Sequence, residues 1–222
     1  MKRILRYLDF IALRLLPTIV LLVILYFSVL NSLQAFNRME NYSIRLFLQE
    51  NSMMSCFAFL GFAVMFRTFK RTGKISVLSR YCAGATALIY ITLYAYAEIQ
   101  SNLLHPLERA INFTNVNYYV LAKNALYGIG LLLLTVNCIL KDRFMKTKWI
   151  LTILCALAIL AASWCLPLYT ITHYDDTASF RFLLNTFLLS YCLCAVIITG
   201  LYPTKTSRKP VAEDTNEEKC PV

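Results

Sequence analysis

Apolar and polar residues alternate in long blocks along this chain. Six apolar blocks are separated by polar segments rich in Asn, Lys, Arg and Pro. A helix crosses a hydrocarbon core with about 20 predominantly apolar residues, and each block approaches that length. The pattern predicts an all-α fold, a polytopic integral membrane protein with one bundle of six transmembrane helices over 1–202. The predicted spans are 10–30, 52–69, 78–100, 118–140, 149–171 and 180–202.

Two polar stretches lie outside these spans. Residues 31–50 carry scattered apolar side chains among mixed charges, which suits either an interfacial helix or an ordinary polar connector. Residues 203–222 change from basic to acidic without apolar periodicity, which predicts a disordered tail. Pro17 falls in the first turns of the first span, where a proline disturbs a helix least.

The composition supports a membrane protein. The chain is 59% hydrophobic and 15% charged with a mean hydropathy of +0.58, which lies outside the range of soluble globular domains. Its net charge of +10 would suit nucleic-acid binding only if the basic residues gathered on one soluble surface. Their distribution has another explanation, so no nucleic-acid partner is expected.

The basic residues are distributed unevenly between the two expected sides of the membrane. With six spans both termini share one side, and most of the 22 Lys and Arg residues lie there. The positive-inside rule then predicts cytoplasmic termini, and we expect an integral protein of a bacterial inner (plasma) membrane. The basic residues expected on the outer side are only Arg38, Arg45, Arg109, Lys123 and Arg181.

Cysteine and glycine are expected to serve packing. Seven of the eight cysteines lie in or beside apolar blocks, where a thiol behaves as a small hydrophobe, and Cys192 and Cys194 are too close for a C-x-x-C pair. Gly128 and Gly130 are not at GxxxG spacing, and close packing of helices is their expected role.

The block 81–100 holds the candidate site. At helical spacing one face carries small residues and then Tyr90, Tyr94 and Glu98. Glu98 and Lys123 are both expected near the outer ends of antiparallel neighbours, as either a structural ion pair or part of an outward-facing binding site. The outer-side binding candidates are Tyr90, Tyr94, Glu98, Lys123, Asn124, Arg181 and Asn185.

Catalytic and metal-binding patterns are sparse. Both histidines, His105 and His173, fall in predicted outer loops, which argues against haem ligation inside the bundle. With Asp175 and Asp176 they are the candidates for a divalent metal, but loop histidines beside acids are commonly hydrated surface. We therefore expect no catalytic residues, metal or cofactor. The sequence also lacks a G-x-S-x-G elbow, a P-loop and a dinucleotide-binding glycine pattern.

Three functions remain open. The first is a non-enzymatic accessory or interaction subunit, expected to bind the lipid bilayer and another membrane protein or itself. The alternative is a small-solute or ion transporter with an outward-facing polar site around Glu98 and Lys123, which makes a small-molecule ligand possible. The second alternative is a membrane enzyme that uses the outer-loop His and Asp groups, and it requires those groups to converge.

Overall fold

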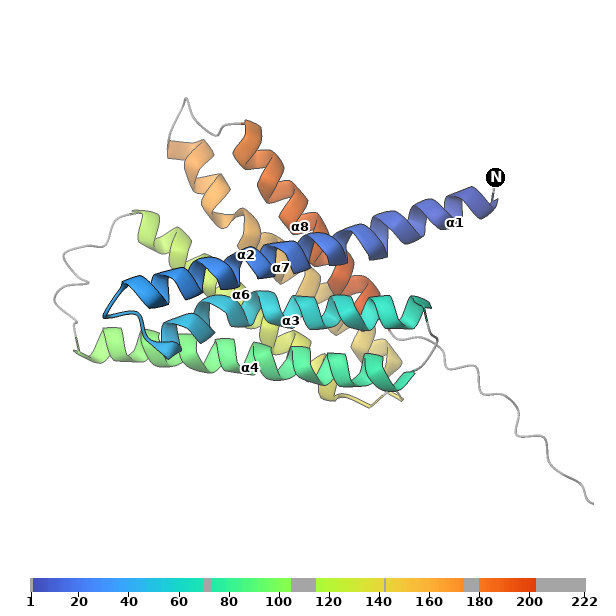
Figure 1. The fold of residues 1–222 in the computed structure, drawn as a ribbon, viewed down its shortest axis with the longest axis horizontal. Coiled ribbons are helices and arrows are strands. Elements are labelled where there is room, and N and C mark those ends of the chain that lie inside the picture. The colour runs from blue at the N-terminus through green and yellow to red at the C-terminus, as the bar shows by residue number, and fades with distance from the viewer. Residues whose placement is uncertain (1, 70–72, 105–114, 142, 174–179, 203–222) are drawn as a thin grey trace, which may run out of the picture.

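The computed structural model describes residues 2–69, 73–104, 115–141, 143–173 and 180–202. These residues form helices and contain no strand, and six of the helical segments are long and apolar enough to cross a membrane. The predicted all-α, six-span fold is confirmed (Figure 1). The elements in order are α1 (Lys2–Phe10), η1 (Ile11–Leu15), α2 (Leu16–Arg38), α3 (Ile44–Phe69), α4 (Gly73–Leu104), α6 (Asn115–Ile139), α7 (Met145–His173) and α8 (Phe180–Leu201).

The first span is one helical segment with a π-helical turn, η1, between α1 and α2. Pro17 lies at the start of α2, directly after this turn, as expected for a residue that cannot donate a backbone hydrogen bond. The Thr18 hydroxyl donates to the Arg14 carbonyl at 2.7 Å, and the Tyr191 hydroxyl of α8 donates to the Ala12 carbonyl at 2.8 Å. The widened turn is therefore tied to α8 through the Ala12 carbonyl.

The prediction for residues 31–50, an interfacial helix or a polar connector, was wrong in part. Helix α2 continues to Arg38 and α3 begins at Ile44, so no separate interfacial helix is present and the connector is confined to 39–43. The polar side chains here face the neighbouring helix. Ser28 donates to Asn51 Oδ1 at 3.0 Å and Ser32 donates to Glu50 Oε2 at 3.0 Å. Because these groups satisfy one another, both helices extend beyond their apolar blocks.

Each span packs against its neighbour in sequence. Contacts join α2 to α3, α3 to α4, α4 to α6, α6 to α7 and α7 to α8, and α8 closes the bundle against α2 and α3. One end of the bundle contains α1, the C-terminal end of α3, the α6–α7 turn and the C-terminal end of α8 (Figure 1). We call it the basic end, because Arg67, Arg80 and Lys148 lie there. The other, the opposite end, contains the 39–43 turn.

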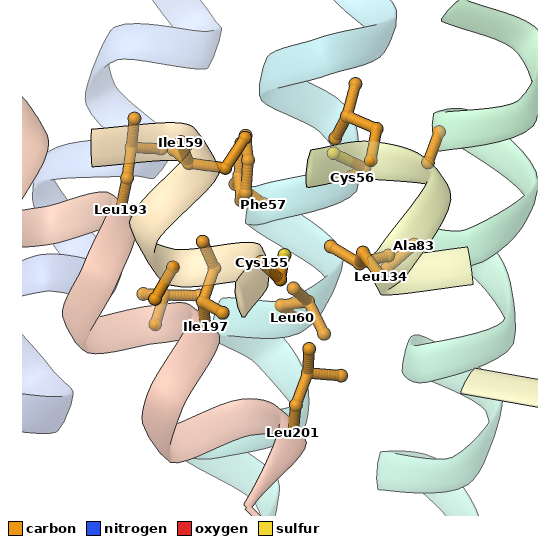
Figure 2. Packing of buried hydrophobic residues seen from close by; sticks show 14 of the residues in the cluster. Cys56, Phe57, Leu60, Ala83, Leu134, Cys155, Ile159, Leu193, Ile197 and Leu201 are labelled. Carbon is orange, nitrogen blue, oxygen red and sulfur yellow. The ribbon is translucent and has the colours of Figure 1, made fainter. Parts of the chain in front are cut away.

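The core lies where α3, α6, α7 and α8 meet. Phe57, Leu60, Leu134, Ile159 and Leu193 are fully buried and their side chains point toward one another (Figure 2). Hydrocarbon lipid supplies little hydrophobic drive between spans, so close packing must hold them together. The stability of this core therefore depends on how well these side chains interdigitate.

Small residues allow the closest approaches. A Cβ at Gly130 would meet Ile159 Cδ1 at 2.7 Å, whereas one at Gly128 would have nothing within 4 Å. The packing role predicted for the two glycines is therefore confirmed for Gly130 and wrong for Gly128. Cys56, Cys155 and Cys192 are fully buried, as the packing role predicted for the cysteines requires, and all seven described cysteines are free thiols.

Candidate functional site

Three of the predicted binding residues meet between α4 and α6. The rings of Tyr90 and Tyr94 stack with centroids 5.8 Å apart and an interplanar angle of 16°. The amide of Asn124 donates to the Tyr94 hydroxyl. Tyr90 is nearly buried, at 8% exposed. The polar stripe on α4 therefore faces the protein interior, as its sequence suggested.

The group continues through α6 to α7. Tyr127 is 7% exposed and its hydroxyl lies 3.3 Å from the Ser163 hydroxyl, which itself donates to the Ile159 carbonyl at 2.8 Å. We call Tyr90, Tyr94, Asn124, Tyr127 and Ser163 the tyrosine cluster. Sequence reasoning missed Tyr127 and Ser163. The spacing contained a signal for the first, because Tyr127 is three residues after Asn124 and shares its helical face.

Glu98 and Lys123 are placed differently from the prediction. Glu98 is half-buried one turn beyond Tyr94 on α4. Lys123 lies within electrostatic reach of Cys165 on α7, and no Glu98–Lys123 ion pair is found among the described residues. Successive residues of a helix point about 100° apart, so Asn124 facing α4 turns Lys123 toward α7. The structural ion pair considered from the sequence is not present.

Arg181 and Asn185 lie on α8, which packs against α7, α3 and α2. Both side chains are exposed, together with Leu184 and Leu188 on the same helical face. The fold therefore does not bring these two candidates to the tyrosine cluster. They form a separate feature near the opposite end of the bundle.

The candidate metal-binding residues lie outside the part of the chain that the structure describes. His105, Asp175 and Asp176 are not among the described residues, and neither is the side chain of His173, the last residue of α7. Within the part of the chain that the structure describes, no group of three or more His, Cys, Asp or Glu side chains is arranged to hold a metal ion. The convergence that an outer-loop enzyme requires stays a prediction.

A polar seam between α2 and α3 was also missed from the sequence. Glu50 accepts hydrogen bonds from Ser32 and from the Tyr42 hydroxyl, and Asn51, 5% exposed, accepts from Ser28. Burial and the bond to Glu50 raise the pKa of Tyr42 above its ordinary value. These residues fell outside the predicted spans because their polarity suits an interfacial helix or a connector, and only the facing helix reveals their partners.

Comparison of the chain with protein-family models, with curated proteins and with solved structures found no match. Function therefore has to be argued from the arrangement of these residues.

Proposed function

We propose that the protein is a non-enzymatic multi-pass membrane protein that acts by binding another integral membrane protein. The surface that would bind the partner is the half of α8 nearest the opposite end. The proposal is supported by the uneven burial of α8. Every buried residue of this helix lies at or after Ser190, and its first turns, from Phe180 onward, contain only exposed or half-buried side chains.

The main support for this proposal comes from Asn185. It is exposed, and the described residues supply no hydrogen-bond partner for its amide. Its neighbours differ, because Thr186 donates to the Phe182 carbonyl at 3.0 Å and Ser190 donates to the Thr186 carbonyl at 2.7 Å. Lipid hydrocarbon offers no hydrogen bond to an amide, whereas a facing helix does. Arg181 lies in the first turn of α8, so Asn185 is the polar group deeper in this half of the helix that needs a partner.

The geometry also indicates the kind of partner. Asn185 lies about 7 Å along the helix axis from Phe180, deeper than the first turn that the headgroups reach. Leu184 and Leu188 flank it on the same face and are 50% and 42% exposed. An apolar face with one amide fits a transmembrane helix that presents a hydrogen-bonding side chain at the same depth. We propose such a helix from a different membrane protein as the occupant.

Purification in mild detergent from the native membrane, followed by native mass measurement, tests the proposal. We expect a defined complex heavier than the chain itself. Asn185→Leu should weaken it by about three- to tenfold, the effect of losing one interhelical hydrogen bond. Thr186→Val is the matched control, because the Thr186 hydroxyl is satisfied within α8. A wild-type protein that runs only as a lone monomer, or a complex indifferent to Asn185→Leu, contradicts the proposal.

The transporter alternative has one observation in its favour. The tyrosine cluster gathers hydroxyl and amide groups from α4, α6 and α7 inside the bundle, where a small solute would be bound. Its described members already bond one another, which favours a structural role. Labelling of a cysteine at position 94 by a membrane-impermeant reagent, with the native cysteines removed, would favour transport over our proposal.

We also propose that the protein lies in a bacterial inner (plasma) membrane with both termini in the cytoplasm. The support is the accumulation of basic side chains at one end, together with the even number of spans. The membrane-enzyme alternative stays open only through residues outside the described ranges, chiefly His105 and Asp175. No described residue adds to it.

A further inference from the structure

Helix α1 extends the first span beyond the rest of the bundle. Phe10, its last residue, packs edge-on against Phe69, the last residue of α3, with ring centroids 5.6 Å apart. Before Phe10, the side chains from Ile4 to Asp9 are all exposed. Among the described elements, α1 makes extensive contacts only with η1, the next turn of its own helix. It therefore projects from the basic end as a segment that the bundle does not cover (Figure 1).

The first span is long enough to cross a membrane without α1. Arg14 and Arg38 bound a stretch of this helix that contains no charged residue. The rise from Arg14 to Arg38 is about 36 Å, whereas the hydrocarbon core is about 30 Å thick. Charged side chains at hydrocarbon depth are costly, so the two arginines belong near the two membrane surfaces. Helix α1, which precedes Arg14, then lies at or beyond the level of the headgroups.

The exposed residues of α1 divide into an apolar face and a charged face. Ile4 and Leu8 are one turn apart and Ile11 of η1 follows them, and these side chains are 65%, 56% and 47% exposed. Arg6 lies about 160° around the helix from both Ile4 and Leu8. The other charged residues of α1 are Lys2, Arg3 and Asp9. A helix with one apolar face and a net positive charge suits the boundary between headgroups and acyl chains.

The π-helical turn η1 supplies a hinge between α1 and the span. Sharp bends in helices occur at such turns, because the extra residue interrupts the regular hydrogen-bond ladder. The turn itself is held by the bundle. Its Ala12 carbonyl accepts from Tyr191 of α8, and Arg14 donates to the Thr68 hydroxyl of α3 at 3.2 Å. A bend at the start of η1 therefore changes the direction of α1 without unpacking the buried core.

We propose that α1 binds the surface of an anionic membrane at the basic end. Turned at η1, it places Ile4 and Leu8 at the acyl boundary and keeps Arg6 among the lipid phosphates. A helix that continued straight out from α2 would leave this apolar face in water. Acyl chains cover that face and anionic headgroups complement the positive charge, so one leaflet satisfies both sides of α1. The inference does not rest on the partner proposed for α8.

Hydrogen exchange of the full-length protein in nanodiscs tests the proposal. Nanodiscs of phosphatidylcholine alone are compared with nanodiscs that contain about one quarter phosphatidylglycerol. Both faces of a nanodisc are open to solvent, so the result does not depend on orientation. We expect the amides of α1 to exchange about tenfold more slowly with phosphatidylglycerol, and added salt to reduce this difference. The amides in the middle of α7 are the internal reference and should exchange alike in both.

Two other outcomes overturn the proposal. Rapid exchange of the α1 amides in both bilayers would show that α1 stands in water and that its apolar face is left for another macromolecule. Equal protection in both bilayers would show that hydrocarbon alone holds α1, as in a straight and tilted span. Neither outcome affects the α8 surface, because the complex proposed there is measured separately by native mass.

Variants assign the effect to the two faces of α1. Arg6→Gln should reduce the phosphatidylglycerol-dependent protection by about fivefold, the contribution of one basic residue near an anionic surface. Leu8→Gln should reduce protection by about tenfold, because the side chain no longer gains from burial among acyl chains. Arg143→Gln is the matched control, since Arg143 is exposed at the same end but lies outside α1. Unchanged protection in Arg6→Gln, or an equal loss in Arg143→Gln, overturns the assignment to α1.

Discussion

Adjacent residues on α6 serve different neighbours. Asn124 donates a hydrogen bond to Tyr94 on α4, whereas Lys123 lies near Cys165 on α7. Tyr127 is hydrogen-bonded to Ser163, which is also on α7. Helix α6 packs between α4 and α7. Because successive residues of a helix point about 100° apart, some side chains of α6 face α4 and others face α7. A stripe read on one helix therefore predicts which side chains face inward, but not which neighbouring helix they contact.

Tyr42 provides a test at the scale of one side chain. Its pKa is raised by burial and by Glu50, so its neutral phenol is favoured in the folded protein. The resulting stability is fully present below the ordinary tyrosine pKa of about 10 and is lost as pH rises through the higher folded value. We expect the unfolding midpoint of the wild type to fall more steeply above about pH 10 than that of Tyr42→Phe.

An exposed tyrosine serves as the control for this measurement. Tyr7 is 69% exposed on α1, and Tyr7→Phe should follow the wild-type profile. Thermal unfolding in detergent between pH 8 and 11 gives all three curves. Parallel curves for the wild type and Tyr42→Phe would show that the Glu50 contact does not contribute to folding.

At the scale of the elements, polar composition gave wrong helix boundaries where two helices satisfy one another's polar groups. Residues 31–50 contain Ser32 and Glu50, and Asn51 follows directly; the polar composition of this stretch predicts a connector. In the structure they pair across α2 and α3, and both helices extend through the region. Helix boundaries were well predicted where apolar composition alone decides them, as at the C-terminal end of α3 and at the start of α8.

Gly130 and Gly128 allow a matched test of helix packing. Alanine at Gly130 must displace Ile159, which is fully buried, and overpacking of this kind costs about 1–3 kcal/mol. Alanine at Gly128 meets open space and gains up to about 1 kcal/mol of helix propensity. We expect Gly130→Ala to lower the thermal midpoint and Gly128→Ala to leave it unchanged or raise it. A shift of the same sign in both would contradict the close α6–α7 contact.

At the scale of the molecule, the distribution of charge makes a prediction about orientation. The basic end should face the cytoplasm, because the positive-inside rule acts on short loops such as the α6–α7 turn. A periplasmic-type phosphatase fused after Val222 should be inactive and the same enzyme inserted after residue 110 should be active. The reverse pattern would invert the topology and place the basic end at the outer surface.

The sequence by itself determined that this chain is a six-span helical membrane protein, because partition into hydrocarbon depends on the composition of each segment alone. It also predicted that the α4 stripe faces inward. Only the tertiary structure decided which polar groups meet: Asn124 with Tyr94, and Ser32 with Glu50, while the Nε and Nη2 atoms of Arg80 have no acceptor. Those outcomes depend on the rotation and contact of helices distant in sequence, and no local pattern encodes them.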